Sequence, residues 1–305
     1  MISRVFGPVL ALTAVFASSG LAQVANTTET PAVTPRLALR QHGPGKFHGR
    51  RPEDLVWLSD NWSGYAVTGS GFTSASGSWT VPAVNCSTAT GTPGTNSSPA
   101  YAAFWVGLDG FSSSTVEQTG TDSDCDGTTP TYYAWFEFYP AGSYELLGFP
   151  VLPGNQMSAT VTYNGSNEFT ISITNATTKQ TYTKSSTVKG AARSSAEWIA
   201  EAPCCTRSGG ILPLSDFGTV DFGSEYTGVS NTNDATDSST SGAISAFGSN
   251  VQVINMETSA GKAEATPSPS LTDGTSGFTV TWNSEGTVAT PVPTGGGGHG
   301  GHGGF

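Results

Sequence analysis

Residues 157–174 read Met157-Ser158-Ala159-Thr160-Val161-Thr162-Tyr163-Asn164-Gly165-Ser166-Asn167-Glu168-Phe169-Thr170-Ile171-Ser172-Ile173-Thr174, and apolar and polar residues alternate on both sides of Asn164-Gly165. Side chains that alternate with a period of two point to opposite faces of a β-strand. Asn-Gly between two such runs is a strong signal for a tight hairpin turn. The stretch therefore predicts two antiparallel strands joined by a turn at Asn164-Gly165.

Strand patterns continue through most of the chain. Short runs rich in aromatic and β-branched residues occur at 71–81, 132–139 and 277–282, and no segment shows a sustained helical period with capping residues. Short strands separated by turn residues at this density are typical of an antiparallel sandwich or barrel. We therefore predict an all-β domain.

The composition suits a protein that works at low pH, although neutral secreted β proteins can share it. Charged residues make up 11% of the chain, against about a quarter in a typical soluble protein. Because cations are few, little positive self-repulsion remains once the carboxylates are protonated. The net charge of −11 also argues against a nucleic-acid partner, which would require a basic patch.

The first 22 residues have the layout of a secretory signal peptide. Arg4 is followed by an apolar run over 5–16 and then by small residues that end at Ala22. The run is too short to span a bilayer, and no later segment reaches the about 18 consecutive apolar residues of a membrane helix. We therefore expect a secreted, extracellular protein with no membrane partner.

Four cysteines in an exported chain suggest disulfide chemistry. A bridge between Cys86 and Cys125 would close a loop of about 40 residues and stabilise the fold by about 3 to 4 kcal/mol. Cys204 and Cys205 are adjacent, and they either bond to each other, pair with separate partners, or stay reduced. We predict the Cys86–Cys125 disulfide and leave the adjacent pair open.

The positions of the histidines exclude several mechanisms. All four lie outside residues 58–290, at His42, His48, His299 and His302. Ser-His-Asp and Cys-His catalysis and a His-ligated zinc ion are therefore excluded from the body of the chain. Carboxylates, amides and hydroxyls remain to carry any chemistry there.

One stretch resembles a calcium-binding loop. Asp122-Ser123-Asp124-Cys125-Asp126-Gly127 matches the opening of such a loop, but Tyr133 stands where the bidentate Glu is required. We interpret the stretch as a solvated acidic turn beside a disulfide. The sequence thus predicts no metal and no cofactor.

Five motifs follow one another in order along the chain. They are Asn61-Trp62-Ser63-Gly64-Tyr65, Trp105-Val106-Gly107-Leu108-Asp109-Gly110, Val116-Glu117-Gln118-Thr119-Gly120, Ala134-Trp135-Phe136-Glu137-Phe138-Tyr139-Pro140 and Ala196-Glu197-Trp198-Ile199-Ala200-Glu201. Together they resemble the glutamic endopeptidases, the eqolisin family. The resemblance implies a lectin-like β-sandwich of two antiparallel seven-stranded sheets. It also implies a catalytic pair, Gln118 and Glu201, and site-lining residues at Trp62, Trp105, Asp109, Trp135 and Glu137.

A Gln–Glu pair suits peptide-bond hydrolysis in acid. The reaction needs a base to activate water, a donor for the oxyanion and an acid for the leaving nitrogen. Glu201 can act as base and then as acid, and the uncharged amide of Gln118 can donate at any pH. For Glu201 to be ionised in acid, its pKa must lie near or below the usual value of about 4.3. The expected partners are protein or peptide substrates of a monomeric enzyme.

Residues 23–57, here called the leader, differ in charge from the body of the chain. Residues 23–51 carry five cations and one acid, a net charge of +4, whereas the residues after Arg51 carry −16. A basic leader can dock on an acidic body at neutral pH and lose its hold as carboxylates protonate. We therefore predict a propeptide at 23–57, a catalytic domain at 58–290 and a flexible Gly/His tail at 291–305. The alternative is a leader with no inhibitory role.

Two rival functions use the same residues differently. A glycoside hydrolase on a lectin-like sandwich would employ Glu137 and Glu201 as its carboxylate pair, and a carbohydrate-binding module would have no catalysis. Gln118 discriminates, because a glycosidase does not need it. Glu197 is a second uncertainty, since its even offset from Glu201 places both carboxylates on one face of a regular strand.

Overall fold

Strands dominate the structure. The computed structural model describes residues 32–286 apart from 39, 88–98, 206–209 and 273, and these residues belong to one compact unit that begins at Ala32. Within this part of the chain, the helical segments are the single turn α1 (Ser224–Thr227) and the 3₁₀ segment η1 (Ile244–Asn250). Neither is long and apolar enough to cross a membrane. The predicted all-β class is confirmed.

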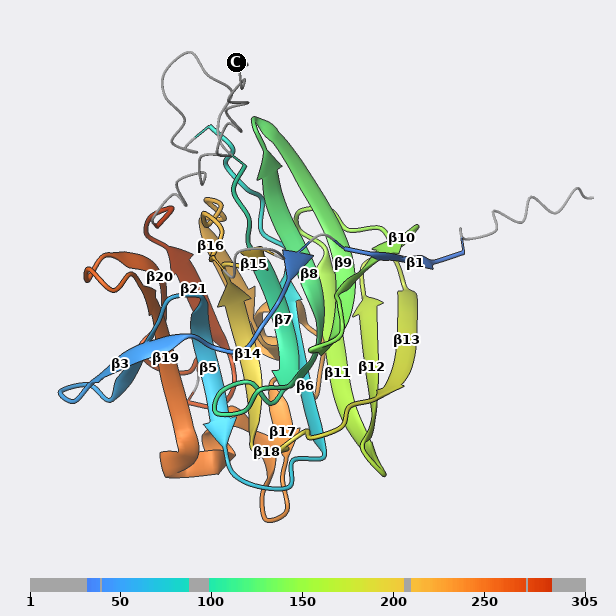
Figure 1. The fold of residues 1–305 in the computed structure, drawn as a ribbon, viewed down its shortest axis with the longest axis vertical. Helices are drawn as coiled ribbons and strands as arrows, with labels where there is room; N and C mark the ends of the chain where they lie inside the picture. Colours follow the sequence, from blue (N-terminus) through green and yellow to red (C-terminus); the bar gives the residue numbers. More distant parts are fainter. Residues whose placement is uncertain (1–31, 39, 88–98, 206–209, 273, 287–305) are drawn as a thin grey trace, which may run out of the picture. The chain divides into compact units, whose positions relative to one another are not determined.

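The first sheet contains seven antiparallel strands and carries the candidate site. Five of them, β5, β14, β7, β8 and β9, lie side by side in Figure 1. From one edge to the other the seven are β10 (Tyr144–Leu147), β9 (Thr129–Tyr139), β8 (Val116–Asp126), β7 (Ala103–Leu108), β14 (Ser195–Glu201), β5 (Trp62–Thr68) and β19 (Val251–Glu257).

The second sheet also contains seven antiparallel strands. In order they are β20 (Ala263–Pro267), β21 (Phe278–Trp282), β16 (Thr219–Phe222), β6 (Ser74–Thr80), β11 (Gln156–Gly165), β12 (Glu168–Asn175) and β13 (Gln180–Thr187). Pairing of β19 with β20 joins the two sheets, and a hairpin of β17 (Asp234–Thr236) and β18 (Ser241–Ala243) attaches to β6. The predicted sandwich of two seven-stranded sheets is confirmed.

Aromatic side chains fill the space between the sheets. Trp79, Phe104, Trp198 and Phe222 are all fully buried there. Trp79 Nε1 donates to Thr121 Oγ1 over 2.9 Å, and Trp198 Nε1 donates to a backbone carbonyl of β6 over 2.7 Å. Because these buried N–H groups are hydrogen-bonded, the indoles stabilise the core without an unpaired donor.

The described part of the leader lies against the body and crosses the first sheet. Its strand β1 (Thr34–Leu37) pairs with β10, β2 (Arg40–Gln41) pairs with β15 (Cys204–Cys205), and β3 (Phe47–Arg51) pairs with β4 (Val56–Ser59). β4 in turn runs parallel to β19. In Figure 1 the blue leader passes in front of β8, β7 and β14.

The predicted hairpin forms, but its turn lies two residues further on. β11 and β12 pair as expected, with Tyr163 opposite Phe169, while β11 continues to Gly165 past a bulge. The turn residues are Ser166 and Asn167, whose φ angles are 52° and 62°. Two successive positive φ angles are what a tight hairpin turn requires, and the bulge moves that requirement past Asn164-Gly165.

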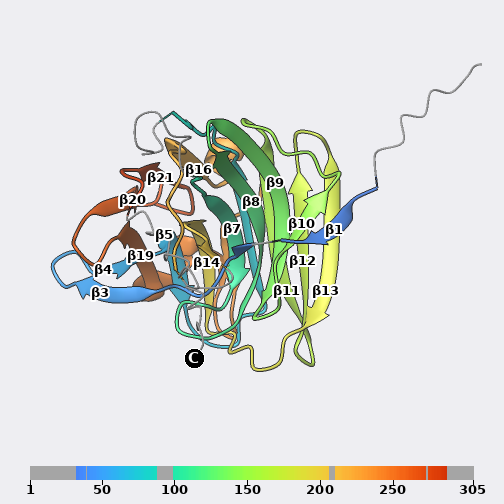
Figure 2. The ribbon, with the colours of Figure 1, turned by 45° about the horizontal axis from the view of Figure 1, so that its top comes forward.

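Hydroxyl pairs cover the outer face of β12 and β13. Their oxygens are 2.8 to 3.1 Å apart in Thr170–Ser185, Ser172–Thr183 and Thr174–Thr181. These side chains face solvent, and Figure 2 shows β12 between β11 and β13. The alternate side chains of β12, including Phe169, Ile171 and Ile173, are buried in the core.

The predicted disulfide between Cys86 and Cys125 is confirmed, with Cα atoms 5.4 Å apart. It ties the end of β8 to the loop that follows β6. This end of β8 carries two aspartates that contact the leader. The bridge therefore braces the strand beside them.

Candidate active site

Strand register gathers the candidate residues on one face of the first sheet. Gln118 on β8 lies opposite Glu137 on β9, and on its other side it lies opposite Gly107 on β7. Gly107 in turn lies opposite Glu197 on β14. Side chains two residues apart on a strand share a face, so Gln118, Glu137 and Glu201 all project toward the leader. We call this surface the site face.

The missing side chain of Gly107 leaves room for an indole. A Cβ at this position would lie 2.9 Å from the ring of Trp105 and 3.2 Å from Cβ of Gln118, closer than side-chain packing allows. Trp105 fills that space and donates from Nε1 to Glu201 Oε2 over 2.7 Å. The ring of Trp62 packs against it, with centroids 4.9 Å apart.

Glu201 lies at the end of β14 and is fully buried. Besides Trp105, it contacts Nδ2 of Asn61 at 3.5 Å. Burial raises its pKa well above the usual range, the nearby Glu137 and Asp122 raise it further, and the hydrogen bond from Trp105 lowers it. The expectation of a pKa near or below about 4.3 is therefore not met while the leader covers the site face, because loss of water outweighs the donors.

Gln118 and Glu137 form a pair across β8 and β9. Gln118 Nε2 lies 3.4 Å from Glu137 Oε2 and donates to the backbone carbonyl of His42. Glu137 Oε2 also accepts the backbone N–H of His42 over 2.8 Å. Burial raises the pKa of Glu137 well above its usual range, so this carboxyl is neutral in acid.

His42 of the leader sits at the centre of these contacts. Its ring stacks on Trp135 with centroids 3.6 Å apart and planes 6° from parallel. Its Nδ1 lies 3.5 Å from Glu201 Oε2. Burial lowers its pKa well below the usual range, and Arg40 lowers it further. No histidine belongs to the catalytic domain by sequence, yet the leader delivers one to the site face.

Arg40 of the leader occupies an acidic pocket next to His42. Its guanidinium binds Asp124, lies 3.5 Å from Asp122, and stacks 4.1 Å from the ring centre of Tyr101. The hydroxyl of Tyr133 donates to Asp122 over 2.6 Å. Burial raises the pKa of Asp122 to about 6 and that of Asp124 well above its usual range, although Arg40 lowers both.

The interpretation of residues 122–127 as a solvated turn is wrong. Asp122 and Asp124 lie on β8 and are 0% and 1% exposed. Both are at even offsets from Gln118, so the period of a strand places them on the site face. That spacing could have identified them from the sequence. Asn61, which fixes Lys46 N of the leader over 2.7 Å, was likewise known only as part of a motif.

Three carboxylates of the motifs, Asp109, Glu117 and Glu197, are buried away from the leader contacts described above. Asp109, at a φ of 69°, accepts the backbone N–H groups of Arg193 and Ser194 over 2.8 Å each. It therefore fixes the entry to β14. Glu197 is fully buried, and its pKa is raised by burial and then by Asp109, with Ser195 opposing.

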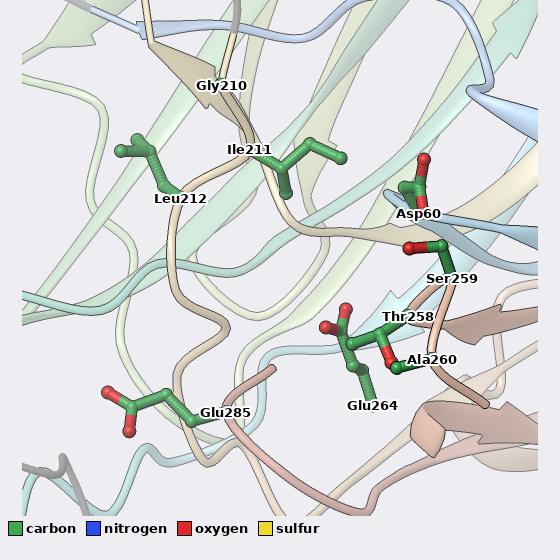
Figure 3. Close-up of a pocket in the computed structure, with 9 residues that line it drawn as sticks. All are labelled: Asp60, Gly210, Ile211, Leu212, Thr258, Ser259, Ala260, Glu264 and Glu285. Carbon is green, nitrogen blue, oxygen red and sulfur yellow. The ribbon is translucent and has the colours of Figure 1, made fainter. Parts of the chain in front are cut away.

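A separate pocket of about 310 Å³ contains none of these residues. Figure 3 shows Asp60, Glu264 and Glu285 on its walls, together with the turn at 258–260. Among the described residues, no group of His, Cys, Asp and Glu side chains has the arrangement of a metal site.

The chain is similar to proteins of a known family. A model of the peptidase A4 family matches residues 60–282. Aspergillopepsin-2 from Aspergillus niger is 31% identical over 193 residues, which cover 58% of this chain and 66% of that protein. Scytalidopepsin B from Scytalidium lignicola is 30% identical over 182 residues, which cover 58% of this chain and 65% of that protein. The match thus spans just under two thirds of the length of these relatives.

Solved structures show the same fold. Scytalido-glutamic peptidase with a transition state analog inhibitor aligns with a TM-score of 0.57 at 25% identity, over 73% of this chain and 98% of that chain. Aspergilloglutamic peptidase from Aspergillus niger aligns with a TM-score of 0.50 at 26% identity, over 60% and 99%.

Fold and site face together define a β-sandwich that presents a Gln–Glu pair to a bound peptide segment. The chain belongs to the peptidase A4 family. The resemblance to glutamic endopeptidases, read from the five motifs, is confirmed.

Proposed function

We propose that the protein is a glutamic endopeptidase that hydrolyses peptide bonds of proteins in acid. Glu201 takes a proton from water as it attacks the carbonyl carbon and then passes that proton to the leaving nitrogen. The amide N–H of Gln118 donates to the oxyanion. Trp105 holds the Glu201 carboxyl in place, and Trp62 supports Trp105.

The position of the leader backbone is the observation that carries this proposal. A peptide carbonyl, that of His42, accepts a hydrogen bond from Gln118, and the same residue lies beside Glu201. The site face therefore holds an extended peptide with a carbonyl where a donor can stabilise developing negative charge. A sugar-binding site would have no reason to grip a peptide carbonyl with Gln118.

A pair of substrates separates the proposed activity from its rivals. The acid-processed protein should cleave denatured casein at about pH 3, near the ionisation range of a carboxyl group, and should leave a β-glucan intact. Peptide products are measured by mass spectrometry and reducing ends by a sugar assay. Release of sugar without peptide products would favour the glycoside hydrolase, and no products from either substrate would favour a binding module.

We further propose that the exported chain is a zymogen. The leader covers Gln118, Glu137 and Glu201, and its His42 ring lies against the Glu201 carboxyl that water must approach. Burial under the leader also keeps Glu201 protonated in acid, so it cannot act as a base. In this proposal residues 1–22 direct export, 23–57 inhibit, and 58–290 act as a monomeric secreted enzyme.

Acid should release the leader. Because the bound His42 has a lowered pKa, a detached leader takes up a proton below about pH 6.5 and the bound one does not, so its binding weakens as the pH falls. The groups that face His42 are Arg40, Asp122, Glu137 and Glu201. The carboxyls beneath the leader act in the opposite sense: burial raises the pKa of Asp122, Glu137 and Glu201, so their protonation favours the bound leader, and release in acid rests on His42.

We expect full-length protein to be inactive at neutral pH and to gain a new N-terminus between Arg51 and Asn61 after acidification. N-terminal sequencing and a peptidase assay, run on the same time course, measure the two events together. Full activity at neutral pH without any cleavage would show that the leader does not inhibit.

A further inference from the structure

The leader shows how the site face holds both polar backbone atoms of one residue. The His42 N–H donates to Glu137 Oε2 over 2.8 Å, and the His42 carbonyl accepts from Gln118 Nε2. Gln118 and Glu137 are direct cross-strand partners on β8 and β9, and both are fully buried. The two side chains therefore form a clamp whose spacing matches the N–H and the C=O of a single residue.

We propose that Glu137 binds the backbone N–H of the substrate residue whose carbonyl is attacked, when the substrate follows the path of the leader. This inference rests on the proposed peptidase function and on the role of Gln118 as oxyanion donor. It assigns Glu137 a specificity role: the residue before the scissile bond must carry an N–H. Proline, which lacks one, is then excluded from that position.

The side chain of His42, rather than its backbone, distinguishes the leader from a substrate. The imidazole stacks on Trp135 and reaches within 3.5 Å of Glu201 Oε2, so it covers the carboxyl that must activate water. A substrate side chain that leaves Glu201 open can use the same two backbone contacts and still be attacked. The clamp therefore serves inhibition and catalysis with the same pair of hydrogen bonds.

The chemistry of Glu137 fits this role in acid. While a peptide covers Glu137 as the leader does, burial raises its pKa and the carboxyl is neutral in acid; a neutral carboxyl keeps a carbonyl oxygen that accepts an N–H. Gln has a carbonyl oxygen in the same place. Glu137→Gln should therefore preserve the contact, whereas Glu137→Ala should remove it.

Two synthetic peptides test the inference on the acid-processed enzyme. One is a peptide that the enzyme cleaves at a single bond, and the other replaces the N–H of the residue before that bond with an ester oxygen, which adds no bulk. Loss of one buried hydrogen bond to a carboxyl group lowers kcat/KM by roughly 10- to 100-fold. We expect that loss for the ester peptide with the wild-type enzyme and with Glu137→Gln.

In Glu137→Ala the amide peptide should itself lose roughly 10- to 100-fold, and the ester should cause no further loss. Glu145→Ala, which removes a carboxylate on the neighbouring strand β10, is the matched control and should discriminate like the wild type. Equal cleavage of the amide and ester peptides by the wild-type enzyme would overturn the inference, as would undiminished discrimination in Glu137→Ala. If the acid-processed wild-type enzyme cleaves no peptide from which the pair can be designed, the proposed peptidase function fails, and the inference fails with it.

Discussion

Replacement of Glu201 by Gln should lower hydrolysis of a denatured protein at about pH 3 by roughly 100- to 10,000-fold, the contribution of a general base. The carboxyl is held by Trp105 at 2.7 Å beside the leader carbonyl that Gln118 binds. An amide has no basic oxygen that can take the proton of the attacking water. The initial rate of casein cleavage by the acid-processed variant measures the loss.

Gln118→Glu should inactivate the Gln118–Glu201 pair in a different way. It exchanges an N–H donor for a carboxyl that repels the oxyanion when ionised and raises the pKa of its acidic neighbours. Loss of one oxyanion donor typically costs about 100- to 1000-fold in rate. Thermal unfolding of each variant should show an unchanged fold.

Glu197→Gln is the internal control for this pair. Glu197 is buried near Ser195 and Asp109, and none of its contacts within the described residues reaches the leader. The variant should keep measurable activity. Robust hydrolysis by Glu201→Gln, together with loss in Glu197→Gln, would move the catalytic role by four residues along β14.

Arg40→Ala should free the site face of the uncleaved protein. The guanidinium is enclosed by Asp122, Asp124 and Tyr101. Burial alone would lower its pKa, but the surrounding acidic groups together raise it by more, so the net shift of the Arg40 pKa is upward. Removing one partner of a buried, hydrogen-bonded ion pair weakens binding by about 2 to 5 kcal/mol, or roughly 30- to 5000-fold. Hydrolysis of a short peptide before any cleavage of the chain should rise accordingly.

Arg36→Ala provides the matched control on the same leader. Arg36 pairs with Glu145, but its side chain is 62% exposed against 25% for Arg40. Exposed ion pairs contribute about 0 to 1 kcal/mol, so this variant should stay inhibited. The assay is best run at the highest pH at which the processed enzyme is active, with chain length checked on a gel. An equal response of both variants would mean that the acidic pocket does not anchor the leader.

The alternation of polar and apolar residues predicted most of the fold, because within each strand it shows which face is buried. The alternation over 157–174 gave the β11–β12 pair, and the class of sandwich followed from similar runs elsewhere. The hairpin turn was misplaced because a bulge between Tyr163 and Gly165 adds a residue that no pattern of polarity records. The disulfide was predicted correctly because Cys86 precedes β7 and Cys125 lies at the end of β8, the strand that pairs with β7.

The site was harder to predict, because its parts come from distant segments. Family motifs placed Gln118 and Glu201 on one face, and their roles there are still a proposal. Nothing local in Arg40 or His42 indicates that they reach across β8 and β14, since the partners lie 84 and 159 residues away. The acids at 122 and 124 fit two patterns, a calcium-loop motif and the strand period that continues from Gln118, and the structure follows the strand period.

The hydroxyl pairs on the outer face of β12 and β13 contribute stability that does not depend on pH. Thr170–Ser185, Ser172–Thr183 and Thr174–Thr181 have no ionisable group. Their hydrogen bonds bind the same number of protons in the folded and unfolded chain, so their contribution to the free energy of unfolding has no slope with pH. The part of the free energy of unfolding that depends on pH therefore comes mainly from the buried carboxyls of the first sheet. The hydroxyl pairs of β12 and β13 therefore keep their bonds at any pH, while the buried carboxyls of the first sheet respond to acid.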